Sequence, residues 1–190
     1  MKTKTLTPVS NLFWLNIFEP RADLSGKQKY SATAIFSKDD LKGYEDLMKA
    51  LRETYEAGRE KLKNSKGQVP AFEEIRLPLR DGDEDKPGHP AYENSWFLTA
   101  KSDFQPAAVD RDCREITDEN QLYNGIRGRL SVTFFCYAFG SNRGIGCSLS
   151  GIQKLADMEG CGSMASRGDE FRDGLVFDES AFPHETELPF

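Results

Sequence analysis

The residues whose types and spacing suggest chemistry alternate along one segment, residues 126–139. Its even-numbered positions are apolar or small, from Ile126 to Ala138. Its odd-numbered positions are Arg127, Arg129, Ser131, Thr133, Phe135, Tyr137 and Phe139. Because successive side chains of a strand point to opposite sides, this pattern predicts a strand with one core face. The second face would carry two guanidinium groups at one end and three aromatic rings at the other.

Cations between aromatic rings are what single-stranded nucleic acid requires, because cations bind phosphates and rings stack on bases. Such stacking contributes roughly 1–3 kcal/mol per base, whatever the base sequence. Residues 96–101 repeat the mixture, with Phe97, Thr99 and Lys101 on one side of a predicted strand. The alternative interpretation is that the aromatic face is covered by a helix or by a second subunit. Two unpaired guanidinium groups would be costly in a core, and this favours nucleic-acid binding.

The net charge of −6 belongs entirely to the end of the chain. Residues 169–190 hold seven acidic residues and one arginine, and the rest of the chain holds 24 acidic and 24 basic residues. Acidic termini are commonly solvated and flexible, but an apolar tip beside the terminal carboxylate is typical of a docking peptide. We therefore expect residues 166–190 to form a flexible acidic tail that docks on a partner protein. The docking residues would be Glu185, Glu187, Leu188, Pro189 and Phe190.

Three acidic residues, Asp81, Asp83 and Asp85, have the spacing of the first ligands in a calcium loop. Lys86 stands where that loop needs glycine, and Tyr92 stands where it needs glutamate. The two histidines are isolated, and the four cysteines form no C-x-x-C pair. The sequence therefore predicts no metal site, no cofactor, no catalytic residues and no enzymatic activity.

The chain has 190 residues, of which 38% are hydrophobic, enough for one packed domain with an appendage. We expect a domain over residues 1–165 and the tail over 166–190. No window approaches the roughly 18 apolar residues of a spanning helix, and no secretory signal opens the chain. These features predict an intracellular protein with reduced thiols.

The elements that must position these residues are mostly strands. Strands are predicted over residues 11–18, 29–36, 96–101, 107–109, 126–139 and 145–149. One helix is predicted over 38–62, with Ser37 as its N-cap and an apolar stripe along one side. Residues 64–93, rich in glycine, proline and charge, predict a long mobile excursion from the domain. This order of elements favours a small, mainly antiparallel barrel or sandwich.

Four segments, residues 30–36, 96–106, 109–113 and 122–135, resemble a family of phage single-stranded DNA-binding proteins long catalogued only as a domain of unknown function. That family is similar in fold to other phage single-strand binders, which are OB-fold proteins with acidic tails. The ending Glu187-Leu188-Pro189-Phe190 resembles the tip of bacterial single-strand-binding proteins, which recruits replication and repair enzymes.

The resemblance implies a mainly β, OB-fold-like, five-stranded antiparallel barrel with one substantial helix. It further implies sequence-independent binding of single-stranded DNA during phage replication or recombination, in the cytoplasm of the bacterial host. It also implies a homodimer or a cooperative array. A tail of this charge could mimic phosphates and compete with DNA for the basic surface.

The candidate DNA contacts follow mainly from the alternation of the strands. The phosphate candidates are Lys29, Lys101, Arg127, Arg129 and Arg143. The stacking candidates are Phe97, Phe135 and Tyr137. Phe104 and Arg111 are further candidates at strand ends or in loops.

Two other functions are compatible with the sequence. A metal-dependent nuclease that uses the residues between Asp81 and Asp85 predicts magnesium-dependent degradation of DNA. A non-enzymatic adaptor or structural protein, whose aromatic face is a subunit interface, predicts that Tyr137→Ala disrupts assembly while DNA affinity is negligible.

Overall fold

The fold is mainly β, with eight strands and one long helix among the residues that the structure describes. The computed structural model describes residues 2–22, 26–64 and 66–158. The strands are β1 Lys2–Leu6, β2 Ser10–Ala22, β3 Gln28–Ser37, β4 Leu79–Asp81, β5 Ser95–Ser102, β6 Ala107–Val109, β7 Ile126–Phe139 and β8 Asn142–Ala156. The helices are α1 Leu41–Gly58, α2 Gly82–Asp85 and the 3-10 helices Arg59–Leu62, Phe72–Glu74, Pro90–Tyr92 and Glu119–Gln121. No helix in these ranges is long and apolar enough to cross a membrane.

Five of the strands close into a barrel. Around the ring they follow the order β7, β2, β3, β5 and β8, and β8 pairs again with β7. Every pair in the ring is antiparallel except β5 with β8, which run parallel. This is the strand arrangement of an OB-fold, so the predicted five-stranded barrel with one substantial helix is confirmed. β1 extends the sheet from β7, β6 extends it from β8, and β4 pairs with β5.

The predicted strand 126–139 coincides with β7. The even-numbered side chains from Ile126 to Cys136 are buried, while Ala138 lies beyond the core and is exposed. The odd-numbered side chains are half-buried or exposed. The alternation of apolar and polar residues therefore identified the core face of β7 correctly. Apolar residues recur at every second position in a strand that is buried on one face.

β2 is longer and less regular than the predicted strand 11–18. Leu12 and Ile17 are both buried, although their odd spacing would put them on opposite faces of a regular strand. The register with β3 shifts between Phe13 and Asn16, which absorbs the difference. β2 continues beyond the predicted end at residue 18 and includes Pro20. β2 pairs with β7 only through residue 12, and proline is tolerated where a strand has lost one neighbour.

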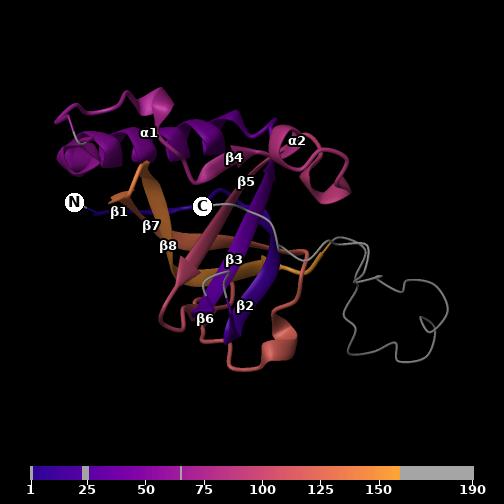
Figure 1. The fold of residues 1–190 in the computed structure, drawn as a ribbon. Helices are drawn as coiled ribbons and strands as arrows, with labels where there is room; N and C mark the ends of the chain where they lie inside the picture. The colour runs from indigo at the N-terminus through magenta and orange to yellow at the C-terminus, as the bar shows by residue number, and fades with distance from the viewer. Residues whose placement is uncertain (1, 23–25, 65, 159–190) are drawn as a thin grey trace, which may run out of the picture.

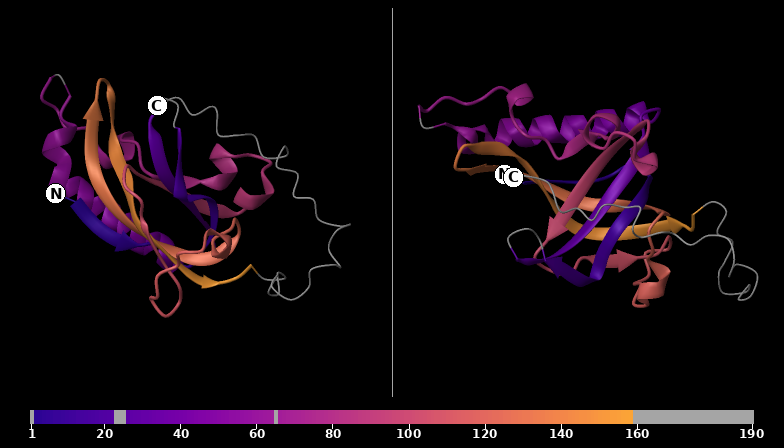
Figure 2. Two further views of the ribbon diagram at one scale, coloured as in Figure 1. Left: turned by 90° about the horizontal axis from the view of Figure 1, so that it is seen from below. Right: turned by 45° about the vertical axis from the view of Figure 1, so that its right-hand side comes forward.

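α1 lies across one end of the barrel (Figure 1). Figure 2, left, views the molecule from the opposite end. The predicted helix 38–62 is confirmed in its centre, but Asp40, not Ser37, is the N-cap, and its carboxylate accepts the Gly43 N–H at 2.9 Å. Leu47 and Leu51 are fully buried in the core. After Gly58 the chain continues as a 3-10 turn to Leu62.

The segment predicted as a mobile excursion, 64–93, carries defined structure. Phe72, Ile75 and Leu79 are buried in the main core. β4 pairs with β5, which is itself paired with β3. The 3-10 helix Pro90–Tyr92 packs against the same sheet. These apolar residues were overlooked because glycine, proline and charge dominate the local composition.

Candidate nucleic-acid interface

The outer surface of the barrel carries one continuous row of polar side chains, because the strand registers align them. Ser31 of β3 pairs with Lys101 of β5, and Lys101 pairs with Ser148 of β8. Ser148 in turn pairs with Thr133 of β7, and Thr133 with Lys4 of β1. Register partners project to the same side of a sheet. The outer side chains of β5 and β7 therefore belong to one surface, joined across β8.

Cations gather at the end of β3 and β5 that is farther from α1. Lys101 is exposed, and no ion pair is found for it among the described residues. Lys29 forms an ion pair with Asp103 at 2.8 Å. Arg21, the register partner of Lys29 on β2, is exposed. Ion pairs at exposed positions are weak, so phosphate could replace Asp103 as the partner of Lys29.

Aromatic side chains gather at the other end of the same surface. Phe97 of β5 meets Tyr92 edge to face, with ring centroids 4.8 Å apart. Tyr92 stacks on Trp14 of β2 at 5.4 Å and 17° between planes. Phe13 and His89 surround this pair. Trp14 has a φ of 50°, a left-handed backbone that costs a residue other than glycine about 1–3 kcal/mol.

A second group of rings lies on the hairpin of β7 and β8. Phe135 faces Gly146 across the ladder, and Tyr137 faces Gly144. A methyl group added at Gly146 would lie 2.5 Å from Cζ of Phe135, so the ring lies directly on the glycine. Both rings are half-buried, which leaves part of each accessible. Phe139, near the end of the hairpin, is 82% exposed.

A model of one protein family, described as the ssDNA-binding protein of Enterobacter phage Enc34, matches residues 3–181. The chain belongs to this family. Among curated proteins, protein p50 of Acyrthosiphon pisum secondary endosymbiont phage 1 is 29% identical over 119 residues. That match covers 60% of this chain and only 58% of the length of p50.

Solved structures of phage single-stranded DNA-binding proteins share the fold of this family member. The Enc34 protein in complex with ssDNA superposes with a TM-score of 0.67 at 21% identity, over 84% of this chain and 90% of that chain. Its C-terminal truncation gives 0.65 at 21% identity, over 82% and 87%. The gp2.5 protein of bacteriophage T7 gives 0.63 at 12% identity, over 93% and 99%. At these identities the likeness shows the fold alone.

In this member of the Enc34 family, five of the predicted contact residues are half-buried or exposed on the outer surface. Lys29 and Lys101 lie on β3 and β5, and Phe135 and Tyr137 lie on the β7–β8 hairpin. Arg127 is exposed, and its register partner on β2 is Asn11. Asn11 is in turn the register partner of Ile35, which packs with Tyr92 and Phe97. The OB-fold binds oligonucleotides on the face of its second and third strands, which here are β3 and β5.

Two predicted arginines are directed elsewhere. Arg129 lines a small pocket of about 270 Å³ with Asp40 and Asp46 at the start of α1. Arg143 donates hydrogen bonds to the carbonyl oxygens of Lys63 and Ser141, at 3.2 and 3.1 Å. Of the two guanidinium groups that the alternation placed with the aromatic rings, that of Arg127 is exposed, whereas Arg129 lines the pocket beside α1. Segments distant in the sequence fold against Arg129 and Arg143.

The predicted exposure of Phe97 is also wrong, because Tyr92 covers its ring and leaves it 2% exposed. Phe104 is 83% exposed in the loop between β5 and β6. Arg111 is exposed in the loop after β6. The predicted docking residues 185–190, with the whole tail 166–190, lie outside the described residues.

Sequence reasoning missed Trp14 and Arg21 as members of this surface. Trp14 was assigned only to a strand, and a regular strand would have placed it on the inner side with Leu12. The irregularity of β2 had one signal in the sequence, the odd number of residues that separates Leu12 from Ile17. This spacing indicates an irregular strand only if both side chains are buried, which the structure shows.

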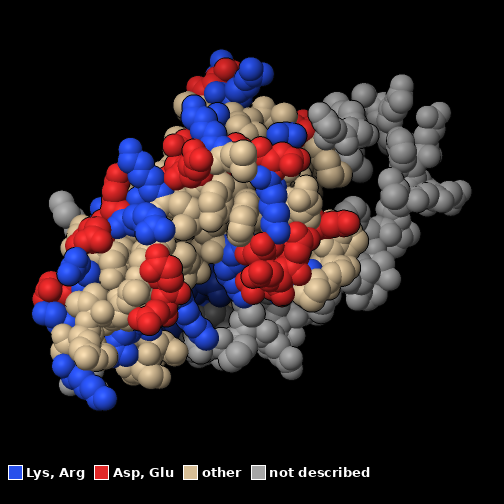
Figure 3. Space-filling model, turned by 90° about the horizontal axis from the view of Figure 1, so that it is seen from above, with Lys and Arg blue, Asp and Glu red and all other residues tan. Residues whose placement is uncertain are grey.

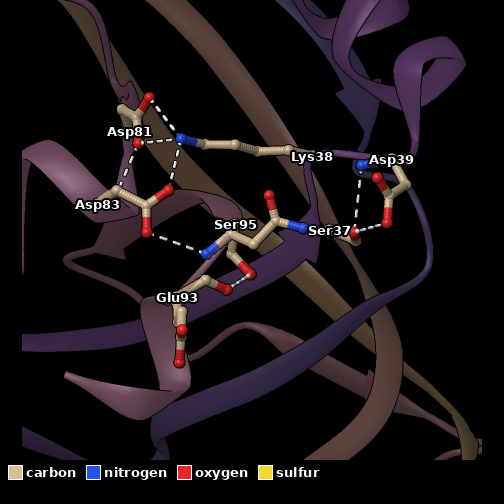
Figure 4. A network of polar contacts seen from close by, with 8 residues as sticks. Ser37, Lys38, Asp39, Asp81, Asp83, Glu93 and Ser95 are labelled. Atoms are coloured by element: carbon tan, nitrogen blue, oxygen red, sulfur yellow. Dashed lines mark hydrogen bonds and ion pairs between the residues drawn. The ribbon is translucent and has the colours of Figure 1, made fainter. Parts of the chain in front are cut away.

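The acidic residues considered for a metal are paired with cations in the structure. The Lys38 ammonium lies 2.6 Å from Asp81 and 2.7 Å from Asp83 (Figure 4). Asp83 also accepts the backbone N–H of Asn94 at 3.0 Å, and Arg80 pairs with Asp85. Among the described residues no group of three potential metal ligands comes together. A metal ion would have to displace the Lys38 ammonium, so these residues serve to attach α2 to the end of β3.

This attachment predicts a dependence on pH. The hydrogen bond from Lys38, and then that from Asn94, hold the pKa of Asp83 below its usual value. Hydrogen bonds to Asp81 and Asp83 raise the pKa of Lys38. The ion pair therefore contributes fully from about pH 4 to about pH 10, and is lost as the pH falls through the lowered pKa of Asp83. We expect hydrogen exchange of the Asn94 amide, corrected for its intrinsic rate, to be constant from about pH 5 to 9 and to accelerate below about 4.

The variant Lys38→Met serves as the control for that measurement. It should expose the Asn94 amide at neutral pH as well, because the Asp83 carboxylate loses its strongest partner. Equal protection of Asn94 in both proteins at every pH would show that the ion pair does not hold this segment.

The face that carries α1 has a different electrostatic character. Lysine and arginine are mixed there with aspartate and glutamate (Figure 3). On α1 itself, the exposed Lys42 and Lys49 alternate with Glu45, Asp46 and Glu53. Mixed charge gives no sustained positive potential, so this face is a weaker candidate for a polyanion than the outer surface of β3 and β5.

Proposed function

We propose that this protein binds single-stranded DNA, without sequence preference, during phage DNA replication or recombination. The observation that carries the proposal is the polar row through Lys101, with cations at one end of the surface and aromatic rings at the other. This surface lies on the strands that bind oligonucleotides in OB-folds. Membership of a family described as ssDNA-binding, and a fold shared with a protein solved in complex with ssDNA, support the same conclusion.

The chemistry of such a surface is binding alone. Lys29, Lys101 and Arg127 would neutralise phosphates, while Phe135 and Tyr137 would stack on bases. Every base has a π-face, so stacking tolerates any sequence. We propose no catalytic step, and the pairing of Asp81 and Asp83 with Lys38 supports this over the nuclease alternative.

The test is a fluorescence-anisotropy titration of labelled poly-dT with the full chain at several salt concentrations. Duplex DNA and single-stranded RNA serve as competitors. Tight binding that weakens with salt, and that duplex DNA competes for poorly, is the expected result. Absence of poly-dT binding at low salt would overturn the proposal. Magnesium-dependent loss of the DNA would instead support the nuclease.

We further propose that the acidic tail competes with DNA. Deleting residues 169–190 removes the whole net charge of −6. The deletion should raise the association rate with poly-dT on the order of tenfold at low salt, because the tail no longer occupies the cationic surface. Stopped-flow anisotropy measures this rate.

A chain of full length, with the acidic residues of 169–187 changed to their amides, is the matched control for that deletion. It should match the deletion if charge is the cause. An unchanged association rate in both variants would contradict competition by the tail.

The tip of the tail, Leu188-Pro189-Phe190, is proposed to recruit replication or recombination proteins once DNA displaces the tail. Assembly as a homodimer or cooperative array on DNA is proposed as well. Light scattering of the full chain, with and without poly-dT, measures its mass.

An adaptor function remains the second candidate because of one observation, the 82% exposure of Phe139 beside Tyr137 on the β7–β8 hairpin. Large exposed rings are typical of protein interfaces as well as of nucleic-acid surfaces. Under this alternative, Tyr137→Ala lowers the assembled mass while poly-dT binding is negligible in every variant.

A further inference from the structure

The rings of Phe97, Tyr92 and Trp14 pack on one another in a column that runs from the interior toward solvent. Phe97 is 2% exposed and Tyr92 is 3% exposed, whereas Trp14 is half-buried. Tyr92 lies between the two others, edge to face with Phe97 and stacked on Trp14. Trp14 is therefore the outer member of the column, and its indole is the ring that a further aromatic group can reach.

The backbone holds Trp14 at this position. Its left-handed φ of 50° falls within the irregular part of β2. The Asn16 side chain donates hydrogen bonds to the Trp14 carbonyl oxygen at 3.4 Å and to the Ser31 hydroxyl at 2.8 Å. Ser31 is the neighbour of Lys101 in the polar row, so the column ends beside the proposed phosphate-binding residues.

The segment 82–94 supplies the supporting ring from outside the barrel. Lys38 binds Asp81 and Asp83 at the start of this segment, and Asp83 binds the Asn94 amide at its end (Figure 4). Tyr92 is thereby held over Phe97. The guanidinium carbon of Arg80 lies 5.2 Å from the centre of the Phe97 ring.

We propose that segment 82–94 is part of the DNA-binding site, where it builds a stacking position for one base on Trp14. Tyr92 is a positioning residue, because its ring stacks on the indole of Trp14 and holds it in place. Among the rings that contact Trp14, Tyr92 is the one that stacks on it, whereas Phe13 is tilted and His89 meets it edge-on. Backbone strain at a half-buried indole is explained if that ring has a ligand. A base stacked there would continue the column, with its phosphate directed to Lys101 or Lys29. The inference rests on the proposed function.

The two tryptophans allow a direct test. Trp96 stacks on Tyr44 of α1, on the opposite face of β5 from Trp14. In the variant Trp96→Phe, Trp14 is the only remaining tryptophan of the chain. Titration with poly-dT should quench its emission by roughly half or more, because a stacked base quenches an indole. The matched variant Trp14→Phe, in which Trp96 reports, should show little quenching.

Affinity gives the second readout. Trp14→Ala should weaken poly-dT binding roughly 5- to 150-fold, the range expected for loss of one stacked base. Tyr92→Leu should lower both the affinity and the quenching of Trp14, while circular dichroism of the full chain shows that the fold is kept. Anisotropy that reports tight binding without quenching of Trp14 would overturn this inference and leave the proposed function intact. No binding by any variant or by the parent chain would overturn both.

Discussion

Replacing Lys29, Lys101 and Arg127 together with alanine is expected to weaken poly-dT binding by about 10²–10³-fold at about 50 mM salt. All three lie on the outer surface of the barrel, where Lys101 and Arg127 are exposed and Lys29 forms an ion pair with the exposed Asp103. If each residue binds one phosphate, its loss also removes the release of counterions that accompanies that contact.

The magnitude follows from the salt dependence of single-strand binding. Each phosphate contact adds about 0.7 to the slope of log K against log salt. Between about 50 mM and about 1 M, a slope of about 0.7 corresponds to roughly an eightfold change in affinity. Three contacts therefore give roughly 500-fold at the lower salt concentration, and the slope should fall by about 2.

A matched variant removes the same charge from a different face. Lys42, Lys49 and Arg59 are exposed on α1 or directly after it, where the surface has mixed charge. Their replacement with alanine should leave the slope of log K against log salt unchanged, because no phosphate contact is lost. Equal slopes in both triple variants would contradict the assignment of the DNA to the outer surface of β3, β5 and β7. Anisotropy at four or more salt concentrations makes the comparison.

Phe134→Ala is expected to lower the free energy of unfolding by about 3–5 kcal/mol. Phe134 is fully buried at the centre of β7 and is among the largest of the fully buried side chains. β1 and β8 flank it, opposite Thr3 and Cys147. Because β1 and β8 are both paired with β7, they cannot move inward to fill the cavity that the alanine leaves. The loss in free energy of unfolding should therefore be near the upper end for an aromatic residue.

The same strand supplies the control for this measurement. Phe139 is 82% exposed, and Phe139→Ala should change the free energy of unfolding by no more than about 0.5 kcal/mol. Urea denaturation of the full chain, followed by far-ultraviolet circular dichroism, measures both variants. Similar midpoints for the two would show that β7 does not bury its even-numbered face as the structure places it.

The predictable parts of the fold were those with a local pattern. The alternation in residues 126–139 identified β7 and its buried face, and the stripe containing Leu47 and Leu51 identified the centre of α1. Helix ends were less predictable, because Ser37 and Asp40 are both good N-cap residues. In the structure Asp40 is the cap, and Gly43, whose N–H it accepts, lies so close to Pro8 that an added Cβ would be 2.7 Å from the proline Cβ. The local sequence does not contain this contact with Pro8.

The candidate site was predictable in residue type and only partly in membership. Lys29, Lys101, Arg127, Phe135 and Tyr137 were predicted as contacts, and the structure places them on one outer surface. Their roles as DNA contacts stay predictions. The registers that bring β5 and β7 together across β8 depend on closure of the barrel, which no local pattern encodes.

The sequence by itself determined that the fold is mainly β with one substantial helix, which face of the main strand is the core face, and that cations and rings lie opposite that core. Only the tertiary structure decided which of those side chains remain accessible. Phe97 is covered by Tyr92, Arg143 is bound by the carbonyl of Lys63, and Trp14 is turned outward by an irregularity of β2. The physical reason is that periodicity depends on neighbours along the chain. Accessibility depends on which distant segment folds over a side chain.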